Sequence, residues 1–349
     1  MKRWAAIFFA VVPLTACMTT TAPPSDSIQK IADDVWRYQL AESIELQQKF
    51  GVPVRHLPDV TFAQAQRDAD FSRAILRRLD AVQPANEDER LTAGVVRWLA
   101  EGAIEEPQLF WYRSPVTPYR TPLFTVHKVL AQMKDEEKTP LLAEMPHLVD
   151  DILGVLREQE RRGIRVPKDE IPAVRGMLDG LAKSLSPEIA RLRAHFDDAY
   201  FAEAPAGVGL SQYPGGAEAY RAFVRQETTT RLTPEQIHEL GLREIARIDG
   251  ELEAIRQEVG FHGSLADFRR SLKTDPRFFA KTPEEVGERL MAPVHRIEAQ
   301  VPRFFAHTPK APYGVKRLAP EFEGGATFGY YQVPTPAEPT GTYISTARS

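Results

Sequence analysis

The sequence predicts a mainly α protein, a multi-helix shell that ends in a short tail of strands and loops. Three observations lead to this fold class. Apolar residues recur every three or four positions through most of the stretch 27–300, which is the spacing of one face of an α-helix. Several of these stretches begin with Ser, Thr or Asn followed three residues later by Glu, Gln or Asp, a pattern that starts helices. Past Pro302 prolines become frequent and the helical spacing stops, so strands and loops are expected there.

The first residues have the pattern of a secretion signal. Lys2 and Arg3 precede an apolar run at 4–13, which is shorter than the roughly 20 residues needed to span a bilayer. The run leads into "LTAC", which resembles the lipobox of bacterial lipoproteins and ends at Cys17, the single cysteine of the chain. Residues 1–16 are therefore predicted to be a lipoprotein signal peptide and Cys17 the lipidation site. The alternative is an ordinary secretory signal with a chance cysteine.

A lipid on Cys17 would place the protein in the cell envelope. Residues 17–26 are rich in Thr and Pro and are predicted to be the lipidated tether. Each buried acyl methylene contributes about 0.8 kcal/mol to membrane binding, so the membrane is the expected partner. Met18, rather than Asp, after the cysteine resembles lipoproteins sorted to the outer membrane, here facing the periplasm. The net charge of −4 and the lack of a basic block indicate no nucleic-acid partner.

Residues 27–349 are predicted to form one helical domain. The stretch 27–51 has one slip in its apolar spacing and ends on Gly51, a common helix stop. Two further helices are expected at 61–82 and, with Asn86 as the N-cap, at 86–108. Two long helices are expected after them, at about 139–162 and 168–184.

Between these helices, residues 107–123 combine four prolines with four aromatic residues. This predicts an irregular loop. Its aromatic side chains would either form a wall of a ligand cleft or fill gaps in the core, and the sequence leaves both interpretations open.

The strongest helix signal lies in the second half. Thr233 is an N-cap candidate, Pro234 fits the first helical position and Gln236 completes a capping box. One apolar stripe then runs over about seven turns to Gly260. The same start pattern predicts helices after Ser264 and Thr282.

No catalytic residue and no metal ligand is predicted from the residues themselves. The pair His238-Glu239 begins the zinc-binding pattern His-Glu-x-x-His, but Leu242 stands where the second His would be. The pair is therefore interpreted as lying on the surface or in a second layer. The other histidines have no ligand spacing, and no nucleophile elbow, phosphate loop or dinucleotide fingerprint occurs.

Longer segments resemble a known family. The segments "GVGLSQYPGGAEAYRAFVRQETTTRLTPEQIHELGLREIARI", "TDPRFF", "VPRFF" and "YYQVPTPAEPTGTYIST" resemble the domain-of-unknown-function 885 family, specifically over about 207–346. The resemblance implies a bacterial, often lipid-anchored protein with a helical fold similar to zinc peptidases. It also implies that full-length relatives continue into a zinc-binding helix and act on peptides. The domain 27–349 is thus expected to be truncated before that helix, with no cofactor in this chain and zinc in the full-length relatives.

The resemblance also suggests substrate-binding residues. In helical zinc peptidases a strand beside the metal helix commonly pairs with the substrate backbone. The residues that correspond to such a strand here, with two tyrosines nearby, are Gly341, Thr342, Tyr343, Ile344, Tyr330 and Tyr331. The alternative is that these residues only complete a sheet.

Two functional hypotheses follow. The first is an envelope lipoprotein that resembles the N-terminal part of a zinc metallopeptidase-like hydrolase and is inactive as given because the zinc motif is absent. The second is a non-enzymatic helical binding or scaffold lipoprotein of the envelope. The residues leave open whether the chain is an enzyme.

Overall fold

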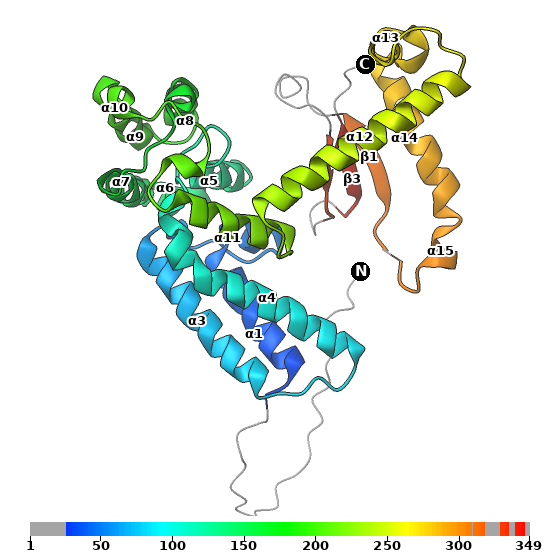
Figure 1. Cartoon of the computed structure of the whole chain (residues 1–349). Coiled ribbons are helices and arrows are strands. Elements are labelled where there is room, and N and C mark those ends of the chain that lie inside the picture. Colours follow the sequence, from blue (N-terminus) through cyan, green and yellow to red (C-terminus); the bar gives the residue numbers. More distant parts are fainter. Residues whose placement is uncertain (1–25, 309, 318–328, 335–338, 346–349) are drawn as a thin grey trace, which may run out of the picture.

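The computed structural model describes residues 26–308, 310–317, 329–334 and 339–345. The fold is mainly α with a three-stranded sheet near its C-terminal end, as predicted. Helices α1 to α11 gather into one region, and α12 leads away from it to a second region that holds α13 to α15 and the sheet (Figure 1). Cys17 and the predicted tether up to residue 25 lie outside the described residues.

The first four helices form an antiparallel group. They are α1 (Ile28–Glu42), α2 (Ile44–Lys49), α3 (Phe62–Asp80) and α4 (Glu87–Leu109). The prediction of a single helix over 27–51 is wrong, because the chain forms two helices that are separated at Ser43. Ser43 has extended backbone angles, and its hydroxyl accepts a hydrogen bond from Leu46 N at 3.2 Å. A serine in this conformation ends one helix and caps the next, which explains the slip in apolar spacing.

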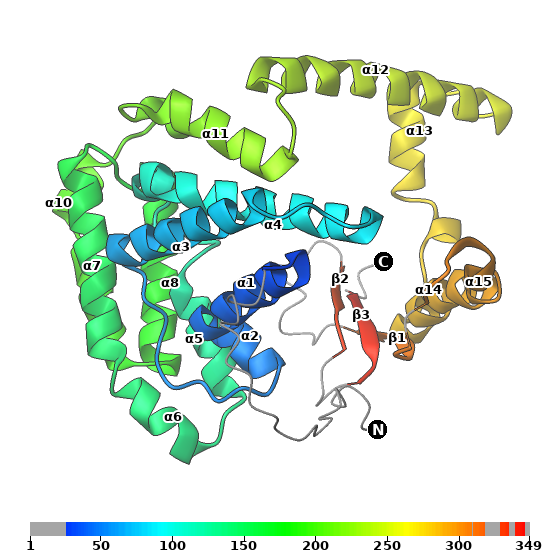
Figure 2. The same ribbon diagram turned by 90° about the horizontal axis from the view of Figure 1, so that it is seen from below.

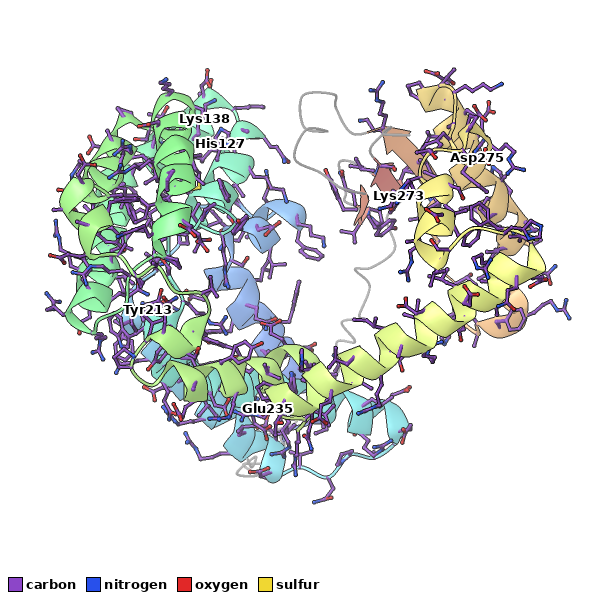
Figure 3. All side chains as sticks on the ribbon, turned by 45° about the horizontal axis from the view of Figure 1, so that its top comes forward. His127, Lys138, Tyr213, Glu235, Lys273 and Asp275 are labelled. Atoms are coloured by element: carbon purple, nitrogen blue, oxygen red, sulfur yellow. The ribbon has the colours of Figure 1, made fainter. Side chains whose placement is uncertain are left out.

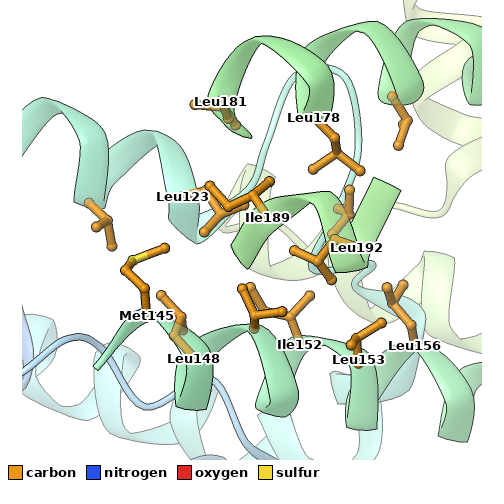
Figure 4. Packing of buried hydrophobic residues seen from close by; sticks show 14 of the residues in the cluster. Leu123, Met145, Leu148, Ile152, Leu153, Leu156, Leu178, Leu181, Ile189 and Leu192 are labelled. Carbon is orange, nitrogen blue, oxygen red and sulfur yellow. The ribbon is translucent and has the colours of Figure 1, made fainter. Parts of the chain in front are cut away.

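The next helices surround the larger core. They are α5 (Pro122–Ala131), α6 (Asp135–Leu142), α7 (Met145–Arg161), α8 (Ile171–Ser184), α9 (Ala190–His195), α10 (Asp198–Glu203) and α11 (Gly216–Thr228). Residues such as Ile152, Leu178 and Leu192 are fully buried between α7, α8 and α9 (Figure 4). The helix expected at 139–162 is divided after Leu142. Pro146 in the first turn of α7 has no N–H and tolerates only a helix start.

Helix α12 (Pro234–Glu258) has the predicted boundaries and capping box. Thr233 Oγ1 accepts from Gln236 N at 3.2 Å, and Gln236 Oε1 accepts from Thr233 N at 2.8 Å. The helix contains no buried residue. Residues of its apolar stripe such as Ile245 and Ile248 are exposed. Glu235 lies in its first turn, and Lys273 and Asp275 lie in the second region (Figure 3).

The last elements are α13 (Leu265–Leu272), α14 (Pro283–Glu298), α15 (Val301–Phe304), β1 (Tyr313–Arg317), β2 (Gly329–Gln332) and β3 (Gly341–Ser345). Ser264 and Thr282 cap α13 and α14 as predicted. The strand order is β1-β3-β2, with β3 parallel to β1 and antiparallel to β2. Gly341 lies against the Tyr331 ring, where an added Cβ would stand 2.0 Å from the hydroxyl. The strand predicted to begin at Gly341 is confirmed, and it is the central strand of its sheet.

Candidate functional site

The candidate site of the described residues is a groove along α4. Helix α4 lies between α1 and α3 on one side and α11 on the other (Figure 2). Two adjoining cavities open along it, one of about 490 Å³ and one of about 500 Å³. They share Asp68, Leu99 and Ala103, so they form one continuous feature, here called the α4 groove.

Local sequence signals set the walls of this groove. Thr61 and Asn86 cap α3 and α4, which fixes where each helix starts and thus which residues face each other. The buried core of α1, α3 and α4, which includes Ile31 and Ile75, holds the three helices together. The break at Ser43 turns the chain at one end of the first cavity. Side chains from four helices therefore meet in one place.

The first cavity has an apolar lining with polar side chains among it. The apolar residues are Val35, Leu46, Phe71, Ile75, Val96, Leu99, Ala100 and Ala103. The polar residues are Tyr38, Gln39, Glu42, Ser43, Asp68 and Ser72. The volume lies within the range of about 300–1,000 Å³ that is typical of small-molecule sites. An apolar lining with a few polar groups is the composition that such sites have.

Asp68 is held by a hydrogen-bond network at the centre of the groove. Tyr38 Oη donates to Asp68 Oδ1 at 2.6 Å, and Gln64 Nε2 donates to the same oxygen at 2.7 Å. The Tyr38 ring stacks on Phe71 with centroids 3.9 Å apart. Burial, together with the hydrogen bond to Asp68, raises the pKa of Tyr38 far above its usual range. Tyr38 thus stays protonated at neutral pH and orients the carboxylate.

Glu42 is the second carboxylate of the first cavity. Burial and the charge of Asp68 raise the pKa of Glu42, and the Arg67 guanidinium opposes them. Arg67 itself is bound to Asp59 and Gln64. Within the described part of the chain Glu42 has neither a hydrogen bond nor an ion pair. The first cavity is therefore lined by two carboxylates and by no Lys, Arg or His.

The second cavity is more polar and partly neutralised. It is lined by Asp68, Trp98, Leu99, Glu101, Gly102, Ala103, Glu105, Glu106, Arg225, Gln226, Thr229, Thr230 and Arg231. Arg225 Nη2 donates to both Glu105 oxygens at 2.6 Å, which ties α11 to α4. Arg113 Nε donates to Glu106 Oε1 at 2.8 Å. Glu101 is exposed, and Arg231 is exposed on the segment after α11.

The structure places the predicted substrate-binding residues elsewhere, on the small sheet. Tyr330 and Tyr331 lie on β2 and are about half exposed, at 55% and 49%. The residues 341–344 lie on β3, whose two edges already pair with β1 and β2. In this structure a substrate backbone could therefore join the sheet only at β1 or β2, and not directly beside β3. A substrate-contacting role for these six side chains stays a prediction.

The aromatic loop contributes to packing rather than to the groove. Phe110 and Trp111 form a cluster with Phe62, with ring centroids 4.9 to 5.4 Å apart. Gln159 Nε2 donates to Trp111 O at 2.8 Å. Tyr119 is 83% exposed, and none of these aromatic residues lines either cavity.

His238 and Glu239 are exposed on α12, as the interpretation of a surface pair predicts. A partly buried histidine that the sequence did not single out, His195, lies between α7 and α9. His195 Nε2 lies 2.8 Å from Glu160 Oε1, although the two atoms are not aligned for a hydrogen bond. Burial lowers the pKa of His195, and Glu160 opposes that shift. Neither residue lines the two cavities of the α4 groove, and the contact packs α9 on α7.

The described residues offer no place for the zinc ion that the family resemblance implies for longer relatives. Among them, no group of three or more His, Cys, Asp or Glu side chains is arranged to hold a metal ion. The carboxylates of the α4 groove do not form such a group either. No chemical step through zinc is therefore derived for these residues.

Comparisons with known proteins agree with the fold and the family resemblance. Residues 175–348 match the model of a family described as "Bacterial protein of unknown function (DUF885)". A solved structure from Colwellia psychrerythraea, provisionally described as a lipoprotein, has the same fold with a TM-score of 0.72 and 17% identity. The match covers 93% of this chain and 68% of that chain. No curated protein matches the sequence. None of the described helices is both long and apolar enough to cross a membrane.

Proposed function

We propose that this chain, which belongs to the DUF885 family of bacterial proteins, is a lipid-anchored protein of the cell envelope whose helical region binds a ligand in the α4 groove. The groove carries the binding part of this proposal. Its two adjoining cavities have an apolar lining, a carboxylate held in place by Tyr38 and Gln64, and a second carboxylate without a partner in the described structure.

The anchoring part rests on the sequence before residue 18. The positive start, the short apolar run and Cys17 form the pattern of a lipoprotein signal. The similar fold of a protein provisionally described as a lipoprotein supports it. Met18 favours the outer membrane, with the protein facing the periplasm.

Cys17→Ser tests the anchor. The variant should take up no labelled palmitate and should remain uncleaved before residue 17, whereas the native chain is labelled and recovered with outer-membrane fractions. A variant that is still processed and still recovered with membranes would rule out lipidation at Cys17.

A cavity-filling substitution tests the groove. Ala103 lines both cavities and is only partly buried, so Ala103→Trp should fill the groove without disrupting the core. Ala63→Trp, on an exposed position of α3 outside the groove, is the matched control. Ligands that raise the melting temperature of the native chain should do so for Ala63→Trp and not for Ala103→Trp. Equal responses of both variants would place ligand binding elsewhere.

The family resemblance supports a second candidate, hydrolysis of peptide amide bonds by longer relatives that carry zinc. The matched region 175–348 contains the motifs on which this rests. In such relatives the tyrosines of β2 and the side chains of β3 would contact the peptide. Residues 18–349, purified and dialysed, should hold far less than one zinc ion per molecule and cleave no peptide. Stoichiometric zinc together with peptide cleavage would instead make this chain itself the hydrolase.

A further inference from the structure

We propose that the ligand of the α4 groove is a short peptide in which a Lys or Arg side chain lies beside apolar side chains. This inference rests on the proposed binding function and specifies its ligand. The cation would lie between Glu42 and Asp68 at the first cavity, and the neighbouring apolar side chains would contact the lining of the groove.

The charges of the first cavity favour a cation. Its lining residues include two carboxylates and no Lys, Arg or His. The charged groups that face Glu42 are Asp68, Asp59 and Arg67, and Arg67 is bound to Asp59 and Gln64. Glu42 therefore experiences more repulsion than attraction, which agrees with its raised pKa. A ligand ammonium or guanidinium between the two carboxylates would relieve this repulsion, because opposite charges stabilise each other strongly in a partly desolvated site.

The geometry of Asp68 favours directed contact with such a cation. Both hydrogen bonds from Tyr38 and Gln64 go to Oδ1. The second oxygen of the carboxylate is thus not used by either donor. A carboxylate oriented in this way can accept a charge-assisted hydrogen bond without first losing an internal partner.

The apolar lining determines the rest of the ligand. Phe71, Ile75 and Val96 come from two helices and surround the interior of the first cavity. Leu99 and Ala103 continue the apolar surface into the second cavity, where Trp98 is partly exposed. Two cavities of about 500 Å³ each hold a few side chains rather than a large folded partner. An apolar peptide with one basic side chain fits both the shape and the charge.

Binding of three capped, fluorescein-labelled tripeptides to residues 18–349, followed by fluorescence anisotropy, tests the ligand. The peptides are Leu-Lys-Leu, the same peptide with norleucine in place of lysine, and Leu-Glu-Leu. The lysine peptide should bind about tenfold or more tightly than the norleucine peptide, as expected for one charged contact, and the glutamate peptide more weakly still. The affinity of the lysine peptide should fall as the salt concentration is raised, because its charged contact is partly exposed.

Matched variants identify the carboxylates. Glu42→Gln and Asp68→Asn should each weaken binding of the lysine peptide about tenfold. Each should leave the affinity for the norleucine peptide within about twofold of that of the native chain. Asp68→Asn keeps a side-chain oxygen that can accept the hydrogen bond from Tyr38. The controls are Glu45→Gln and Asp70→Asn, which are neighbours on α2 and α3 that line neither cavity. They should leave both affinities within about twofold of the native chain.

A stability measurement separates a ligand role from a structural one. Partial burial and the neighbouring Asp68 disfavour a charge on Glu42, so Glu42→Gln should raise the melting temperature at neutral pH while it weakens binding. A residue kept for folding would show the opposite change in stability. Because the pKa of Glu42 is raised in the folded state, its charge destabilises the fold above that pKa, and the gain from Gln should disappear as the pH falls and Glu42 is protonated.

The outcomes distinguish the two proposals. If the lysine and norleucine peptides bound equally and Ala103→Trp abolished both, the preference for a cation would be overturned. The groove would still be the binding site. Binding of the lysine peptide that Glu42→Gln and Asp68→Asn leave unchanged would overturn the assigned residues. Failure of all three peptides to bind would overturn the inference. If Ala103→Trp also left every other ligand response unchanged, the proposed groove function would fail as well.

Discussion

Residues 28–228 and residues 234–345 have similar amphipathic sequence patterns, but their apolar faces have different surroundings. Both hydrophobic cores of the described structure lie in the first region. In the second region, the buried apolar side chains among the described residues are those of Phe268 and Ile344. The stripe on α12 is exposed, with Ile245 58% and Ile248 43% accessible. An apolar stripe therefore predicts a helix but does not determine what covers it.

The largest expected difference between the regions is the cost of removing an apolar side chain. Ile152 in α7 is fully buried, so Ile152→Ala should lower the free energy of unfolding by about 3 kcal/mol through lost burial and a residual cavity. Ile248→Ala on α12 should change it by less than about 0.5 kcal/mol, the usual range for a surface position. Urea denaturation followed by circular dichroism measures both.

An equally large loss for Ile248→Ala would break the comparison. It would mean that the α12 stripe is buried in solution, for example by self-association. Large exposed apolar patches favour such contacts, and sedimentation velocity of the same samples would detect them.

Local features of this fold were predictable from the sequence. The caps at Asn86, Thr233, Ser264 and Thr282 were all expected, because a cap depends on residues only three positions apart. The strand at 341–345 was expected from its β-branched and aromatic residues. The break at Ser43 was missed because its neighbours on both sides favour a helix.

The α4 groove was not predictable from the sequence. Tyr38, Asp68 and Ala103 come from three helices, and no spacing along the chain brings them together. The contact between His195 and Glu160 was missed for the same reason. The position of β3 in the middle of its sheet also depends on long-range pairing, so the sequence indicated a strand but not which of its edges would be free.

Removing the N-cap side chains of α4 and α12 should have smaller effects that also differ between the two regions. Asn86 Oδ1 accepts from Glu89 N at 2.9 Å, so Asn86→Ala should lower the global free energy of unfolding by about 1 kcal/mol. Thr233→Ala removes the equivalent contact of α12. Since α12 is hardly packed, its loss should appear as faster hydrogen exchange in the first turn of α12, with little change in global stability. Equal global losses would show that α12 unfolds together with the first region.

The smallest expected effect is a pH dependence confined to the first region. Burial lowers the pKa of His195 in the folded state below the usual 6.5, so the unfolded chain binds a proton more readily. The neutral imidazole fits the folded state, so its contribution to stability is fully present above about pH 6.5. Stability falls as the pH drops through 6.5 towards the lower pKa of the folded state. The attraction of Glu160 opposes the effect of burial, which keeps the net effect small. His195→Gln should reduce the difference in melting temperature between pH 7.5 and 5.5, and His238→Gln on the exposed face of α12 is the control. A reduction that is the same in both variants, or that is absent in His195→Gln, would show that the partly buried His195 does not distinguish the two regions.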